Sequence, residues 1–123
     1  MKYNTIKSVV LVLALFSLTP AYAFLGIGEP PLAISTRDDC LMGPGKVLII
    51  VNTSDKPIHN VTVAAENFEL HQTLKLVVVA VTLGPHETVE VGWAEVKWRF
   101  QYGEQVNVCA YGYFSDIRRY IPK

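Results

Sequence analysis

The chain has little cysteine and no excess of charge of either sign. Its 123 residues include two cysteines, and 11 Lys and Arg balance 11 Asp and Glu. Two cysteines are too few for a disulfide-built miniprotein or a four-thiolate zinc site. Balanced charge argues against a general nucleic-acid binder, which carries a basic excess. The length fits one domain, and a hydrophobic content of 50% argues against a disordered chain.

Long hydrophobic runs are also scarce, and the first of them belongs to a leader. Met1–Lys7 carries two lysines and no acid, Ser8–Thr19 is apolar, and Ala21-Tyr22-Ala23 follows Pro20. A basic segment, a short apolar run and an A-x-A site together make a secretory signal peptide. The run is shorter than the roughly 20 residues of a spanning helix. We expect cleavage after Ala23 and a periplasmic or secreted protein, with an uncleaved N-terminal anchor as the alternative.

The remainder lacks a second run long enough to span a membrane. The longest candidate is Leu74–Leu83, whose length fits a buried strand. We therefore expect no stable membrane insertion after cleavage. The sequence also has no G-x-S-x-G elbow, no Walker-type loop and no dinucleotide-binding glycine loop. These absences predict a protein that is not an enzyme and needs no cofactor.

What the sequence does contain is a series of short β-branched segments separated by turn residues. After an irregular N-terminal segment at 24–31, strands are predicted at Leu32–Thr36, Val47–Asn52, His59–Ala65, Leu74–Leu83, Thr88–Val91 and Gln105–Tyr113. Gly92–Phe100 is read either as a further strand or as an irregular crossing. No segment has a sustained helical period. The pattern predicts an all-β fold, a single small sandwich of about six to seven antiparallel strands over residues 32–123.

Three stretches repeat an arrangement of a turn followed by an alternating strand: Val47–Val63, Leu83–Gly92 and Phe100–Ala110. With this arrangement the chain resembles bacterial secreted immunoglobulin-like or fibronectin-III-like β-sandwich domains. One departure is Asn107, which stands two residues before Cys109 where a tyrosine corner would have Tyr. The resemblance implies adhesion, interaction or ligand binding, and it transfers no site residues.

Cys40 and Cys109 lie near opposite ends of the predicted mature domain. In an oxidising compartment we expect one structural disulfide between them, which would place the first strand region beside the last. A redox-active pair or two free thiols are the alternatives. Redox pairs usually have the close spacing of C-x-x-C, which is absent here.

Metal-binding residues are present but dispersed. His59, His71 and His86 are not at ligand spacing, and we expect them on the surface or in turns. Asp38 and Asp39 are neighbours, but adjacent strand residues point to opposite faces, so a solvated turn is the simpler reading. No metal site is predicted.

Aromatic residues gather in the last third of the chain. Tyr and Trp are common at interaction surfaces because they combine a large apolar area with a polar tip. The alternative is an ordinary core with an aromatic rim. The candidates for partner binding are Trp93, Trp98, Tyr111, Tyr113 and Tyr120.

Together these features predict an exported, non-enzymatic protein-binding module, one version of which is an inhibitor or immunity protein. The expected partner is another envelope or exported protein and not nucleic acid, and the contact is an aromatic face or an exposed strand edge. Two alternatives stay open. One is a structural or accessory subunit of a cell-envelope assembly, and the other is a carrier of a small ligand or metal. The oligomeric state is left open.

Overall fold

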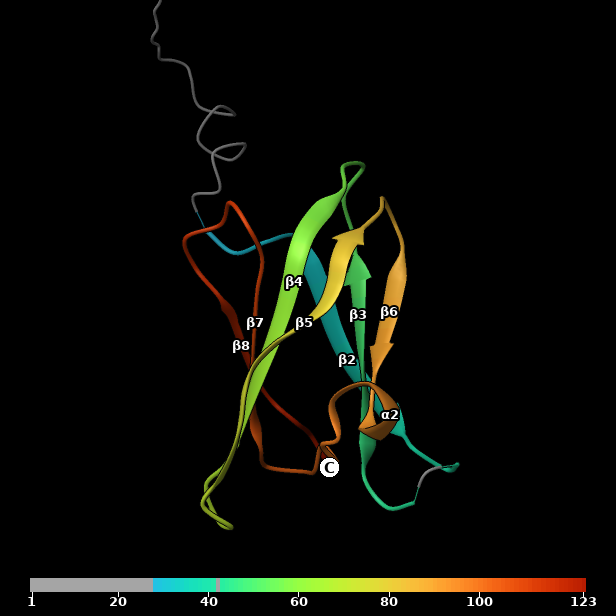
Figure 1. Ribbon diagram of the computed structural model, residues 1–123, viewed down its shortest axis with the longest axis vertical. Coiled ribbons are helices and arrows are strands. Elements are labelled where there is room, and N and C mark those ends of the chain that lie inside the picture. The colour runs from blue at the N-terminus through green and yellow to red at the C-terminus, as the bar shows by residue number, and fades with distance from the viewer. Residues whose placement is uncertain (1–27, 42) are drawn as a thin grey trace, which may run out of the picture. The chain divides into compact units, whose positions relative to one another are not determined.

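The computed structural model describes residues 28–41 and 43–123 (Figure 1). The predicted signal peptide, Met1–Ala23, and residues 24–27 lie outside the described residues. All the described strands belong to one compact unit, residues 30–111 with 116–123. Gly28, Glu29 and 112–115 belong to a second unit, within which the Ser115 N–H donates to the Gly28 carbonyl at 3.3 Å.

Seven described strands form two antiparallel sheets. They are β2 (Leu32–Asp38), β3 (Lys46–Asn52), β4 (Ile58–Asn67), β5 (Gln72–Leu83), β6 (Thr88–Val91), β7 (Gln105–Cys109) and β8 (Ile117–Tyr120). One sheet has the order β2-β3-β6, and the other has the order β5-β4-β7-β8. The predicted fold class is confirmed: the molecule is a small all-β sandwich (Figure 1).

The core follows from the alternation of apolar residues along the inner strands. In β4 the alternating buried side chains are Val61, Val63 and Ala65, with Ile58 and Asn67 also buried at its two ends, and in β7 they are Val106 and Val108. Every second residue of a strand points to the same face, so these side chains meet those of the other sheet. From that sheet the core receives Leu48, Ile50 and Val91.

The connection Gly92–Phe100, for which the sequence left two readings, is mainly irregular. It opens with a one-turn helix, α2 (Trp93–Val96), whose Glu95 carboxylate accepts the Gly92 N–H at 2.6 Å. Lys97 ends the helix in the left-handed region at φ 54°. Fully buried Phe100 then forms a single bridge to Lys46. This bridge ties the connection to the start of β3.

The end of the chain differs from the prediction. The strand predicted at Gln105–Tyr113 ends at Cys109, and a further strand, β8, was not predicted. β8 has the sequence Ile-Arg-Arg-Tyr, and only Ile117 is buried. A strand with one inward apolar residue and two arginines shows no alternation in the sequence.

The predicted disulfide is not formed, and both cysteines are free thiols. The bridge between Lys46 and Phe100 brings the loop that contains Cys40 near the start of β7, whereas Cys109 is the last residue of β7. Four residue steps along a strand span about 13 Å. Disulfide-bonded residues need Cα atoms no more than about 6.8 Å apart. The Cys109 side chain also lies on the face opposite the buried Val108, away from the core.

Candidate interaction surfaces

The two sheets have four outermost strands, and one of them is unlike the other three. β6 and β8 have four residues each, and both carry charge, at Glu90 and at Arg118 and Arg119. β2 ends in Arg37 and Asp38. β5 has 12 residues, and Lys75 is its single charged side chain. Charged and short edge strands resist pairing with other chains, whereas a long apolar edge invites it.

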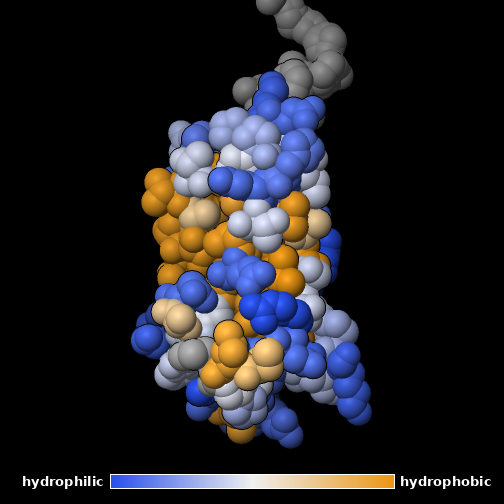
Figure 2. Space-filling view, turned by 90° about the vertical axis from the view of Figure 1, so that its right-hand side faces the viewer, coloured by the Kyte–Doolittle hydropathy of each residue, from blue (hydrophilic) through white to orange (hydrophobic). Residues whose placement is uncertain are grey.

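Three apolar side chains of β5 are exposed, whereas the other apolar side chains of the strand are half-buried or, at Leu83, buried. Leu76 is 64%, Val78 53% and Val81 71% exposed, and Phe68 and Leu70 in the preceding turn are also exposed. Figure 2, which faces the right-hand side of Figure 1, shows apolar side chains gathered around the middle of that side, with mostly polar side chains at the upper end. Exposed apolar area of this kind makes this edge the candidate interaction surface.

This exposure corrects the expectation that Leu74–Leu83 is a buried strand. The strand itself is confirmed, since β5 contains the whole segment. β5 pairs with β4 on one side and has no strand on its other side. The pairing with β4 also has two register irregularities, between Val61 and Thr62 and between Val63 and Ala65. An outermost strand with such bulges turns fewer of its side chains into the core.

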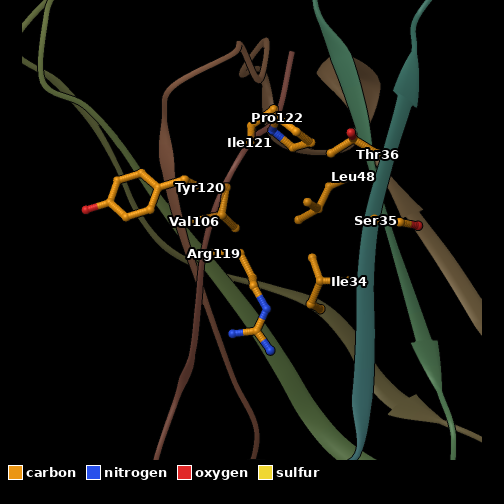
Figure 3. A pocket seen from close by; sticks show the side chains of 9 residues that line it. All are labelled: Ile34, Ser35, Thr36, Leu48, Val106, Arg119, Tyr120, Ile121 and Pro122. Atoms are coloured by element: carbon orange, nitrogen blue, oxygen red, sulfur yellow. The ribbon is translucent and has the colours of Figure 1, made fainter.

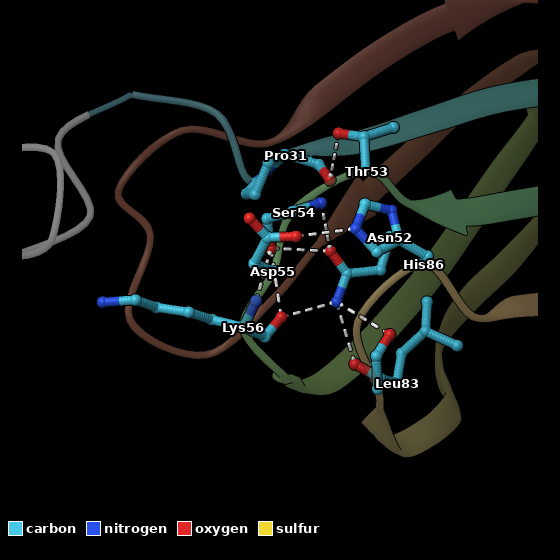
Figure 4. A network of polar contacts seen from close by, with 9 residues as sticks. Pro31, Asn52, Thr53, Ser54, Asp55, Lys56, Leu83 and His86 are labelled. Atoms are coloured by element: carbon cyan, nitrogen blue, oxygen red, sulfur yellow. Dashed lines mark hydrogen bonds and ion pairs between the residues drawn. The ribbon is translucent and has the colours of Figure 1, made fainter.

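A buried asparagine holds the C-terminal end of β5 (Figure 4). The Asn52 side chain is fully buried, and its Nδ2 donates to the carbonyls of Lys56, Leu83 and Gly84 at 2.7, 3.1 and 3.0 Å. Its Oδ1 accepts the N–H and the hydroxyl of Ser54 at 2.9 and 2.8 Å. One amide therefore joins the β3–β4 turn to the end of β5, because both of its polar atoms find partners there.

A second contact joins the β3–β4 turn to the β5–β6 turn at the surface. A ring nitrogen of His86 lies 2.8 Å from Asp55 Oδ1 (Figure 4). Both side chains are largely exposed, and exposed ion pairs contribute about 0–1 kcal/mol. Asn52 is accordingly the principal anchor of this end.

A second buried network holds the turn between β4 and β5. Asn67 Nδ2 donates to Glu104 Oε2 at 2.8 Å, and Asn67 Oδ1 accepts the Leu70 N–H at 2.9 Å. Glu104 is 2% exposed, and its Oε1 accepts Trp98 Nε1 and the Gln101 N–H, each at 3.0 Å. A buried carboxylate is tolerated when several donors satisfy its oxygens. Both ends of β5 are therefore fixed by buried polar groups.

The structure brings two of the five predicted partner-binding residues together. Trp93 and Trp98 line a pocket of about 230 Å³ with Lys97, Arg99 and Glu104. The Arg99 guanidinium lies 4.5 Å from the centre of the Trp93 ring, and the Trp98 indole N–H is bonded to Glu104. The Trp93 ring thus contacts Arg99 of its own connection, and the Trp98 indole contacts Glu104 just before β7, so both indoles have partners within this part of the chain.

The three tyrosines lie elsewhere. Tyr111 follows β7, where its N–H donates to the His59 carbonyl at 2.9 Å and its side chain is exposed. Tyr113 belongs to 112–115. Tyr120 is on β8, and its hydroxyl donates to Gln105 Oε1 at 3.1 Å. Among the described residues of the unit that holds the strands, no single aromatic surface unites Trp93, Trp98, Tyr111 and Tyr120.

A groove of about 380 Å³ separates β2 from β8 (Figure 3). Its apolar walls include Ile34, Leu48, Val106 and Ile121, and Arg119 also lines it. The Tyr120 ring points away from the groove (Figure 3). The strands on both sides of this groove carry charge, which distinguishes it from the β5 edge.

The two thiols differ in environment. Cys40 is exposed, whereas Cys109 is half-buried on β7. Partial burial, together with the Asp116 carboxylate, raises the pKa of the Cys109 thiol above its ordinary value. Both effects disfavour the thiolate, which is the reactive form.

Across residues 28–41 and 43–123, no group of three or more His, Cys, Asp or Glu side chains lies close enough together to hold a metal ion. His59 lies on β4, and His71 and His86 lie in turns. All three side chains are exposed. The same part of the chain contains no helix that is long and apolar enough to cross a membrane.

Comparison with known proteins gives no relative: no protein-family model, no curated protein and no solved structure matches the chain. The residues that distinguish the β5 edge, Leu76, Val78 and Val81, were not among the sequence-predicted site residues. The signal was present in the Leu74–Leu83 run, which is apolar at nearly every position and has one charge. Such a run fits a central strand and an outermost strand equally well.

Proposed function

We propose that the protein is an exported, non-enzymatic protein-binding module of the immunoglobulin-like or fibronectin-III-like type, and that it binds by adding a partner's strand to β5. The observation that carries the proposal is the exposure of Leu76, Val78 and Val81 on a long, nearly uncharged outermost strand. Strand addition draws affinity from main-chain hydrogen bonds and specificity from alternate side chains. The signal-like N-terminal sequence supports export.

The chemistry of β5 specifies its partner. An added strand has to be extended over much of the length of β5, and it has to be apolar, because Lys75 is the one charged side chain that it would meet. A charged partner residue opposite Val78 or Val81 would lose water without gaining an ion pair. The partner segment is therefore an uncharged apolar strand.

The contacts that hold the two ends of β5 favour strand addition at this edge. Asn52 holds the end of β5, and Asn67 and Glu104 hold the turn before it. A site that is already ordered loses less conformational entropy when it binds than a mobile loop does. The strand is thus ready to accept a partner without first folding.

The test is affinity capture from an envelope extract with three forms of the full-length chain. The forms are the unchanged protein, Val78→Lys and Tyr120→Lys, and hydrogen exchange is then measured on the captured complex. Both substitutions place a lysine on an outermost strand of the same sheet at a position more than half exposed.

We expect the unchanged protein and Tyr120→Lys to capture the same partner in stoichiometric amount, with slowed exchange in β5, and Val78→Lys to lose it. Capture that survives Val78→Lys and fails with Tyr120→Lys would assign the contact to the β8 side and overturn the proposal.

A further inference from the structure

We infer that the strand added to β5 is β5 of a second copy, so that the protein forms a two-fold dimer through this edge. The inference rests on the proposed function, because it names the partner of the same edge. Its basis is that β5 itself has the properties inferred above for the partner segment. It is extended over 12 residues, and its exposed side chains Leu76, Val78 and Val81 are apolar.

Charge supports a second copy in antiparallel orientation. Two β5 strands related by a two-fold axis near the middle of Leu74–Leu83 run in opposite directions. The axis then passes close to Val78, and the Lys75 residues of the two copies lie on opposite sides of it. At about 3.3 Å per residue their positions are about 23 Å apart, beyond the roughly 8 Å over which exposed charges interact at physiological salt. A parallel arrangement would place the two lysines side by side.

The two short outermost strands, β8 and β6, do not offer the same fit. Two β8 strands would bring Arg118 and Arg119 of both copies together over only four residues. Two β6 strands would bring together two copies of Glu90 over the same short length. Like charges that face each other across strands are destabilising. Self-pairing is therefore favoured at β5 over β6 and β8.

Dimerisation through β5 has a consequence for binding. It would join the two four-stranded sheets into one of eight strands and cover Val78 in both copies. An exposed apolar edge is also a site of uncontrolled association, and a closed two-fold pairing removes it. Any other strand that binds β5 then has to displace the second copy.

The experiment is charge complementation at Val78, the position nearest the axis. Val78→Lys and Val78→Glu are prepared in the full-length chain, alone and as an equimolar mixture, with Tyr120→Lys as the matched control. Sedimentation equilibrium gives the dissociation constant of each sample. Recovery of a dimer in the mixture also shows that both variants are folded, because an unfolded chain cannot complement.

We expect the unchanged protein and Tyr120→Lys to dimerise equally well. Each Val78 variant alone should dimerise about tenfold more weakly or worse, and the mixture should recover most of the affinity. An unchanged protein that stays monomeric to millimolar concentration, while Val78→Lys still loses the captured partner, overturns the dimer and leaves the proposed function standing. A dimer that Tyr120→Lys weakens and Val78→Lys does not overturns both.

Discussion

β5 and β8 are the two outermost strands of the same sheet, and they differ in length and in charge. β8 has four residues, and two of them are the exposed arginines Arg118 and Arg119. β5 is three times as long, is anchored at both ends and has Lys75 as its one charge. An outermost strand with charge repels incoming chains, whereas an apolar one accepts them. The contrast teaches that length and charge, more than position in the fold, distinguish the two edges of this sheet.

The largest expected effect comes from removing the anchor at the end of β5. Asn52→Asp replaces the donor to Lys56, Leu83 and Gly84 with a carboxylate that faces three carbonyls. We expect the free energy of unfolding to fall by about 2–4 kcal/mol, as measured by urea denaturation. Hydrogen exchange in β5 should rise at the same time.

The control for that substitution lies on the β8 side. Asn107 Nδ2 donates to Asp116 Oδ2 at 2.6 Å in a part-buried contact. Asn107→Asp removes this donor and places a second carboxylate beside Asp116, but water and Arg118, 3.8 Å from Asp116, reduce the repulsion, so we expect a loss of only about 1 kcal/mol. Equal losses for the two substitutions would remove the distinction between a fixed β5 and a less fixed β8.

An intermediate effect is expected on aggregation. Arg118→Val makes β8 resemble β5, and Val81→Lys makes β5 resemble β8. Because charge on an outermost strand opposes edge-to-edge pairing, we expect the first to speed and the second to slow light-scattering growth near the melting temperature, each by several-fold to about tenfold. If both variants aggregate at the rate of the unchanged protein, edge charge does not govern association in this molecule.

The smallest effect concerns the two thiols. Cys109 lies on β7 between β4 and β8, and the pKa of its thiol is raised by burial and by Asp116. A raised pKa lowers the thiolate fraction at pH 7, so Cys109 should react with a maleimide several-fold more slowly than exposed Cys40. Mass spectrometry after partial labelling measures the ratio. Faster labelling of Cys109 would indicate that β8 frays from the sheet.

Strand positions were predictable from the sequence where apolar residues alternate. Val61, Val63 and Ala65 signal β4 because only every second residue faces the core. The run Leu74–Leu83 predicts a strand equally clearly, but it is apolar at nearly every position. Such a run cannot reveal whether one edge or both edges of the strand are paired, and the prediction of burial was therefore wrong for Leu76, Val78 and Val81.

The candidate site was harder to predict because it depends on contacts between distant segments. The sequence shows Asn52 only as the residue before a turn, and its link to Leu83 appears when the chain folds and the end of β5 meets the end of β3. A tryptophan in the sequence is equally typical of a loop contact and of an interface, so the sequence could not show which role Trp93 and Trp98 have. The separation of Cys40 from Cys109 likewise depends on which end of β7 faces the loop after β2.

The most direct test of the central claim is residue-resolved hydrogen exchange of the full-length chain by NMR, at concentrations from low micromolar to millimolar. The account predicts that amides of β5 become at least about tenfold more slowly exchanging as concentration rises, because a second strand covers that edge, while those of β8 do not change. Slowing that is equal in β5 and β8, or confined to β8, would contradict it.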